Sequence, residues 1–157
     1  PPRRSFDLNH EGTKQEDTIK AAVELGLLYV KERRFAEAND RFGKLRDRAA
    51  DWRDPAAART AAAAARLGLA VVLAYENKAD ASNRLFQEAV AQDLTKVQYP
   101  KLDRAAVSVS WTLLRHPDLS HAVSEALTRN AANLGKTRLD SPALEQLRTP
   151  PRAAKKE

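Results

Sequence analysis

The chain has 157 residues, of which 43% are hydrophobic and 31% are charged, and it contains no cysteine. This length suits one domain with a substantial core, and the composition excludes a chain that is disordered throughout or embedded in a membrane. The lack of cysteine excludes disulfides, thiolate metal sites and a cysteine nucleophile. The net charge of +6 permits attraction to nucleic acid, anionic lipid or acidic protein without choosing among them.

The first part of the chain predicts an arm followed by two helices. Residues 1–12 are expected to form the arm, because Thr13 followed by Glu16 fits a capping box at the start of a helix. A helix is predicted over about 14–33, where apolar residues recur every three or four positions. A second amphipathic helix is predicted over about 35–50 at the same spacing.

The middle of the chain predicts a second pair of helices. Asp54 can cap a helix, and Pro55 suits the first helical position, where its missing amide costs nothing. An alanine-rich helix is expected from there to about Asn77, and a fourth helix over 79–92. The most membrane-like window is 56–75, but it contains two arginines, so we expect a buried helix of a soluble domain.

The last part of the chain predicts two longer helices, a short helix and a tail. The longer helices are expected over 101–115 and 118–134, and the second should stop at Gly135. A short C-terminal helix is expected within 136–148, and 149–157 should be disordered. The predicted fold class is therefore all-α, with antiparallel helical hairpins over about 14–50, 55–92 and 101–134.

A repeated pattern of residues begins in the first hairpin. It consists of Leu25, Gly26, Tyr29, Phe35, Ala38 and Phe42. This pattern resembles the tetratricopeptide repeat (TPR), and weaker copies place Ala70 and Ser110 at the position of Gly26. The resemblance implies three hairpins stacked as a short right-handed TPR-like superhelix over 13–135. An ordinary helical bundle with one repeat-like hairpin is the alternative.

The glycine and its two equivalents are expected at close helix–helix contacts. Glycine costs about 1 kcal/mol of helix propensity relative to alanine, whereas burial of a large apolar side chain contributes about 1.5 to 3 kcal/mol. Close packing can therefore offset the cost at Gly26. The copies are not spaced as in the family, whose period is 34: 70 minus 26 is 44, and 110 minus 70 is 40.

The resemblance also implies a groove lined by the first helix of each hairpin. Carried over position by position, its residues form an apolar floor with basic edges. They are Val23, Leu27, Val30, Lys31, Leu67, Val71, Tyr75, Arg104, Val107, Trp111, Leu114 and Arg115. The family's clamp for the carboxylate of chaperone tails needs polar residues in that floor, so we do not expect it here.

The predicted function is that of a scaffold or adaptor, which binds a protein segment or an identical subunit in this groove. Alternatively, the groove is covered by the chain itself, through residues 139–148 or through Phe6 and Leu8 of the arm. A second alternative is nucleic-acid binding by a basic helical-repeat domain. Its candidate residues are Arg33, Arg34, Arg41, Lys44, Arg46, Arg48 and Arg53. Acidic residues four positions before Arg41 and Lys44 weaken that alternative.

The sequence contains no phosphate-binding loop, nucleophile elbow or paired metal-ligand motif. His116 and His121 do not fall on one helical face. We therefore expect no enzyme activity, metal or cofactor. We also see no signal peptide or transmembrane segment, which favours a cytoplasmic protein without membrane insertion.

Overall fold

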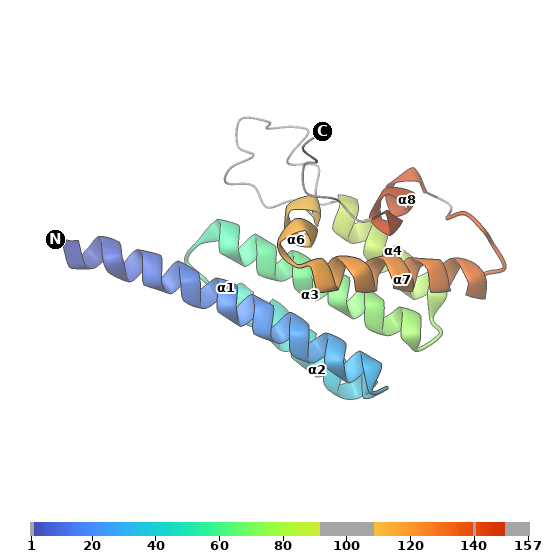
Figure 1. Ribbon diagram of the computed structural model, residues 1–157, viewed down its shortest axis with the longest axis horizontal. Helices are drawn as coiled ribbons and strands as arrows, with labels where there is room; N and C mark the ends of the chain where they lie inside the picture. Colours follow the sequence, from blue (N-terminus) through green and yellow to red (C-terminus); the bar gives the residue numbers. More distant parts are fainter. Residues whose placement is uncertain (1, 92–108, 140, 150–157) are drawn as a thin grey trace.

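The computed structural model describes residues 2–91, 109–139 and 141–149, and the regular secondary structure of this part of the chain is all α-helix (Figure 1). The predicted all-α class is confirmed. Arg104, Val107 and the expected tail from residue 150 lie outside the described residues. The helices are α1 (Pro2–Lys31), α2 (Phe35–Ala49), α3 (Pro55–Tyr75), α4 (Ala79–Ala91), α6 (Val109–Arg115), α7 (Pro117–Asn133) and α8 (Pro142–Arg148).

Helix α1 is longer than the sequence predicts. It runs without a break from Pro2 to Lys31, so Thr13 and Glu16 lie inside it and the predicted helix start near residue 14 is wrong. Extending a helix that is already formed costs little, because each added residue gains a backbone hydrogen bond. In Figure 1 the N-terminal end of α1 projects beyond the other helices, so it does not fold back over them.

The central element is α3, which contacts α1, α2, α4, α6 and α7. It begins as predicted, because the Asp54 carboxylate accepts a hydrogen bond from the Ala56 N–H at 3.0 Å and Pro55 occupies the first turn. By length and composition α3 is also apolar enough to cross a membrane, and half of its most apolar window is buried inside the domain.

The ring of Phe42 fills the space between three helices. Phe42 is fully buried on α2, between Gly26 of α1 and Gly68 of α3. A Cβ atom added at Gly26 would lie 2.4 Å from the ring, and one added at Gly68 would lie 2.3 Å from it. The expected role of Gly26 as a close-approach site is confirmed. Gly68 has the same role, which the repeat pattern in the sequence did not indicate.

The second hairpin is also closely packed at its expected small residue. Ala70 and Phe86 are fully buried, and the hydroxyl of Ser82 on α4 donates to the Ala70 carbonyl at 2.6 Å. Asn130 of α7 is buried as well, and its Nδ2 donates to Ser82 Oγ and to Asn83 Oδ1, both at 2.9 Å. This network ties α3, α4 and α7 together.

Helices α1, α3 and α7 end in the same way, and each ends close to its predicted limit at 33, Asn77 or 134. The residue after each last turn has a positive φ: 60° at Arg33, 64° at Asn77 and 70° at Gly135. Each following N–H donates to a carbonyl five residues back: Arg34 to Tyr29 at 2.8 Å, Lys78 to Leu73 at 2.9 Å, and Lys136 to Ala131 at 2.8 Å. These are the bonds of the Schellman motif, which satisfies carbonyls at a helix end.

Helix α7 thus shares its type of ending with α1 and α3. Helix α7 packs against α3 and α4 and pairs with α8, whereas α6 contacts α3 and α7. Ser110 on α6 is exposed, so the third copy of the repeat pattern is wrong. The physical reason is that a small residue beside a leucine occurs on many amphipathic helices and does not by itself define a helix–helix contact.

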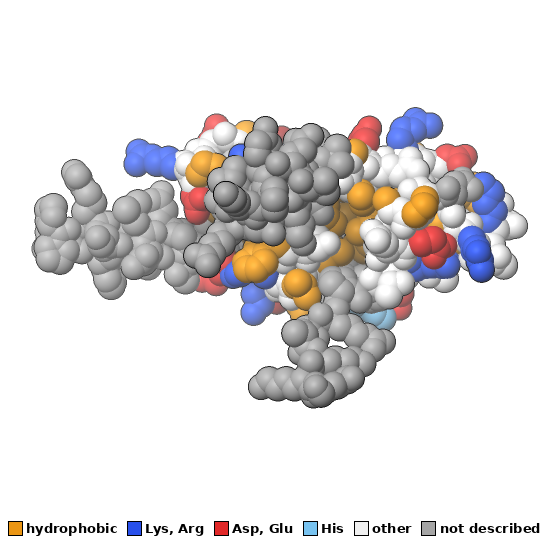
Figure 2. All heavy atoms as spheres, turned by 90° about the horizontal axis from the view of Figure 1, so that it is seen from above, with side chains coloured by type: hydrophobic (Ala, Val, Ile, Leu, Met, Phe, Trp, Pro, Cys, Tyr) orange, Lys and Arg blue, Asp and Glu red, His pale blue; other side chains and the backbone are white. Residues whose placement is uncertain are grey.

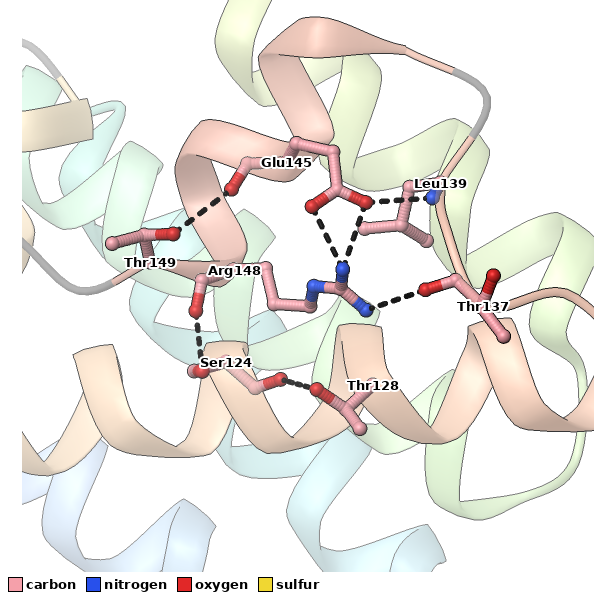
Figure 3. Close-up of polar contacts among 7 residues, drawn as sticks. All are labelled: Ser124, Thr128, Thr137, Leu139, Glu145, Arg148 and Thr149. Carbon is pink, nitrogen blue, oxygen red and sulfur yellow. Dashed lines mark hydrogen bonds and ion pairs between the residues drawn. The ribbon is translucent and has the colours of Figure 1, made fainter.

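The C-terminal helix α8 is held on α7 by the polar contacts drawn in Figure 3. The Glu145 carboxylate accepts from the Leu139 N–H at 2.7 Å and from Arg148 Nη2 at 2.8 Å. Arg148 also donates to the Thr137 carbonyl at 3.3 Å, and the Ser124 hydroxyl donates to the Arg148 carbonyl. The loop before α8 is thereby fixed to α8, and the Ser124 contact joins α8 to α7.

This carboxylate makes the attachment of α8 sensitive to pH. The hydrogen bond from Leu139 and the nearby Arg148 lower the pKa of Glu145 below its ordinary value of 4.5. Its contribution to stability is therefore fully present above pH 4.5 and is lost as the pH falls through the folded-state pKa. We expect Glu145→Gln to destabilise the protein at pH 7, and we expect the difference from wild type to shrink as the pH falls below 4.5.

Urea unfolding followed by circular dichroism at several pH values measures this difference. Glu88→Gln is the matched control, because it removes the same charge from an exposed position on α4. A constant difference between Glu145→Gln and wild type from pH 7 down to pH 3 would contradict the role given to the carboxylate.

Candidate functional site

The expected groove floor is mostly core. Val23, Leu27, Val30, Leu67 and Val71 are all buried, with exposed fractions of 8% or less. An open apolar floor at these positions is therefore wrong. They are covered because α1, α3 and α7 pack against one another and α6 lies on α3 and α7. The alternative cover, residues 139–148, lies elsewhere, since α8 packs on α4 and α7.

Helix α6 packs on α3 and α7 with one side and exposes the other. Val109 and Leu113 are buried, whereas Trp111 is 47% exposed and Leu114 is 45% exposed. The guanidinium of Arg115 lies 5.3 Å from the centre of the Trp111 ring and also forms an ion pair with Glu16 of α1. The predicted residues Trp111, Leu114 and Arg115 are therefore together at the surface.

Seen from above, the molecule shows hydrophobic side chains in the middle of its face and acidic and basic side chains toward its ends (Figure 2). Helix α6 lies on the upper side in Figure 1, and hence on the side that Figure 2 shows. We call the exposed pair Trp111 and Leu114 the α6 patch.

Tyr75 is engaged within the chain at the end of α3. Its hydroxyl donates to the Glu125 carboxylate at 3.4 Å, and the guanidinium of Arg129 lies 5.1 Å from its ring centre. Arg129 also donates to Asn77 Oδ1 at 3.1 Å. Burial raises the pKa of Tyr75, and the charge of Glu125 raises it further. Tyr75 therefore joins α3 to α7. Lys31 of α1, which was also predicted at the edge of the groove, is exposed.

The histidines do not form a metal site in the described part of the chain. Burial lowers the pKa of His116, and the adjacent Arg115 lowers it further. His121 Nε2 lies 2.9 Å from the Glu125 carboxylate on the same helix. Among residues 2–91, 109–139 and 141–149, no group of three or more histidine, cysteine or acidic side chains is arranged to hold a metal ion.

A second surface feature is a cavity of about 230 Å³ between α1 and α2. The residues that line it from α1 are small or apolar, and those that line it from α2 are mostly basic. The lining residues are Thr18, Ala21, Ala22, Leu25, Arg41, Lys44, Leu45 and Arg48. We call this cavity the basic pocket. Sequence reasoning missed it, although the spacing of its three cations, at 41, 44 and 48, places them on one face of α2.

The cations of the basic pocket are unequally neutralised. Lys44 Nζ forms an ion pair with Asp40 at 3.0 Å. In the part of the chain that the structure describes, Arg41 and Arg48 have no ion-pair partner, and Arg41 Nε is buried without a hydrogen-bond acceptor. Leaving a buried donor unpaired costs about 1–3 kcal/mol.

Comparison of the chain with protein-family models, with curated proteins and with solved structures found no match in any of the three.

Proposed function

We propose that this chain is a non-catalytic protein-interaction domain that binds an apolar protein segment through the α6 patch. The observation that carries the proposal is the exposure of Trp111 and Leu114, one turn apart on α6, beside Arg115. Tryptophan and arginine are enriched among the residues that contribute most to binding at protein interfaces. The buried side of α6, with Val109 and Leu113, provides a fixed support for them.

The arrangement of the long helices supports the comparison with tetratricopeptide repeats. In hairpin α1/α2 Gly26 lies against the buried ring of Phe42, and in hairpin α3/α4 the corresponding residues Ala70 and Phe86 are both fully buried. Their shared helix endings, at Arg33 and Asn77, are 44 residues apart, as are Gly26 and Ala70. We propose that α1/α2, α3/α4 and α7/α8 are three TPR-like hairpins, stacked as a short right-handed superhelix with α6 on the face of their first helices. Fold alone does not define function, so the α6 patch carries the functional argument.

Nucleic-acid binding is the less favoured alternative, because several of its candidate residues are engaged by acidic side chains. Arg34 forms ion pairs with Glu32 and Glu37, and Lys44 forms one with Asp40. A basic net charge alone does not indicate a specific nucleic-acid site.

Site-specific photo-crosslinking in cells tests the proposed function. We expect a photoreactive phenylalanine analogue at position 111 to form protein adducts, which mass spectrometry can identify. The matched control carries the same analogue at position 28, because Leu28 is 48% exposed on α1 and lies outside the α6 patch. Adducts with a second copy of the chain would identify that copy as the partner segment.

Two results would overturn the proposal. One is an equal yield of the same protein adducts at positions 111 and 28, which would indicate random encounters at the surface. The other is a predominance of nucleic-acid adducts at position 111. Leu114→Ser in the crosslinking chain should reduce the protein adducts, because leucine 114 supplies the adjacent half of the α6 patch.

A further inference from the structure

We propose that the basic pocket between α1 and α2 binds an acidic protein segment in which apolar side chains lie between carboxylates. The inference rests on the proposed function, that the chain binds protein, and it adds a second site and a chemistry for the partner. The site is separate from the α6 patch, because α1 and α2 alone supply its lining.

Charge complementarity indicates an anionic ligand. Three cations from α2 line the pocket, and only Lys44 has an acidic partner within the described residues. The Nε of Arg41 is buried and has no acceptor in that part of the chain, so the domain itself leaves this donor unpaired. Arginine is suited to carboxylates and phosphates because its planar guanidinium can donate two parallel hydrogen bonds.

The shape of the pocket favours a peptide over a nucleic acid. Ala21, Ala22 and Leu25 give its α1 wall an apolar character, and the cavity of about 230 Å³ is large enough for an aliphatic side chain. The lining contains no aromatic residue on which a base could stack. Acidic residues beside the cations, such as Asp40, also interrupt the continuous positive path that a phosphate backbone requires.

The spacing of the free arginines suggests the spacing of the ligand's carboxylates. Arg41 and Arg48 are seven residues apart on α2, which corresponds to about 10 Å along a helix. In a polyproline II segment, which has three residues per turn and rises 3.1 Å per residue, residues three positions apart lie on the same side of the chain and about 9 Å apart. A segment with two acidic residues separated by two apolar residues therefore matches the pocket.

Fluorescence anisotropy with the full chain tests this inference. The probe is a fluorescein-labelled peptide whose core reads Glu, Leu, Leu, Glu, with blocked ends. Comparison peptides replace both glutamates by glutamine or both leucines by serine, and a single-stranded DNA of twelve nucleotides represents nucleic acid. We expect the first peptide to bind most tightly, and each comparison peptide to bind at least about tenfold more weakly.

The protein variants separate a local site from general surface charge. Arg41→Gln with Arg48→Gln should weaken binding of the first peptide by at least about tenfold, since two charged hydrogen-bond donors are lost. The control pair, Arg46→Gln with Arg53→Gln, removes the same charge outside the pocket and should change affinity by less than about twofold. Ala21→Leu should also weaken binding about tenfold, because it fills the apolar side of the pocket without changing charge. Circular dichroism checks that each variant is folded.

Several results would overturn the inference: no binding of the first peptide, equal binding of the serine peptide, equal losses in the two arginine pairs, or tighter binding of the DNA. The proposed function is tested by a different measurement, the photo-crosslinking at position 111. If crosslinks at position 111 are obtained but the peptide does not bind, only the basic pocket is refuted. Trp111→Ala should leave peptide binding unchanged, which keeps the two sites experimentally distinct.

Discussion

Phe42→Ala is expected to lower the free energy of unfolding by about 3–5 kcal/mol. Phe42 is fully buried, and its ring lies between the backbones of α1 and α3 at Gly26 and Gly68. Because glycine has no side chain, neither helix can extend a group into the space that the ring leaves. The cavity should therefore remain largely open, which places the cost toward the upper end of the range for phenylalanine.

Urea unfolding followed by circular dichroism measures this change. Phe35→Ala is the matched control, since it deletes the same group from the same helix at a partly exposed position. We expect it to cost less than half as much, because less apolar surface is exposed by its removal. Equal costs for the two variants would contradict the central position assigned to Phe42.

Local signals in the sequence predicted most of the individual helices. The start of α3 followed from Asp54 and Pro55, and the end of α7 followed from Gly135, because these residues act on the neighbouring backbone. The ends of α1 and α3 use the same motif but place Arg33 and Asn77 at a positive φ. Arginine rarely adopts this conformation, so its identity gives no signal, and the following hydrogen bonds must hold it there.

The order in which helices pack was less accessible to sequence reasoning. The contact between α7 and the second hairpin depends on Asn130 and Ser82, whose side chains meet although they are 48 residues apart. No periodic pattern along the chain indicates such a pair. Local spacing alone favours α6 as the site of the third copy of the repeat, although Ser110 there is exposed.

Only part of the candidate site could be predicted, because the contacts between helices are not encoded in local patterns. Hydrophobic periodicity identifies the apolar face of a helix but not what covers that face. Val23 and Leu67 belong to such faces and are buried against neighbouring helices, whereas Trp111 and Leu114 are on the exposed side of α6, which packs on α3 and α7. The basic pocket needs two helices at once, because neither the apolar wall of α1 nor the cations of α2 form a cavity alone.

Replacing either of the glycines beside Phe42 by alanine should destabilise the protein, although alanine is the better helix former. Gly68→Ala would place a Cβ atom 2.3 Å from the Phe42 ring, which is confined on its other side by α1 at Gly26. Overpacking of a core costs about 1–3 kcal/mol, and the gain in helix propensity of about 1 kcal/mol offsets only part of it. Urea unfolding of Gly26→Ala and Gly68→Ala measures the net loss.

Gly43, a glycine within α2 that lies away from the Phe42 ring contacts, supplies the control. A Cβ atom at Gly43 would meet only the end of the Arg46 side chain, at 3.9 Å, so Gly43→Ala should stabilise the protein by about 0.5–1 kcal/mol. Combining Gly68→Ala with Phe42→Ala tests the mechanism, because alanine lacks all of the ring atoms that the new Cβ atom would approach. In that background Gly68→Ala should become neutral or stabilising. If it destabilises the protein equally in both backgrounds, contact with the Phe42 ring is not the reason why this helix keeps a glycine.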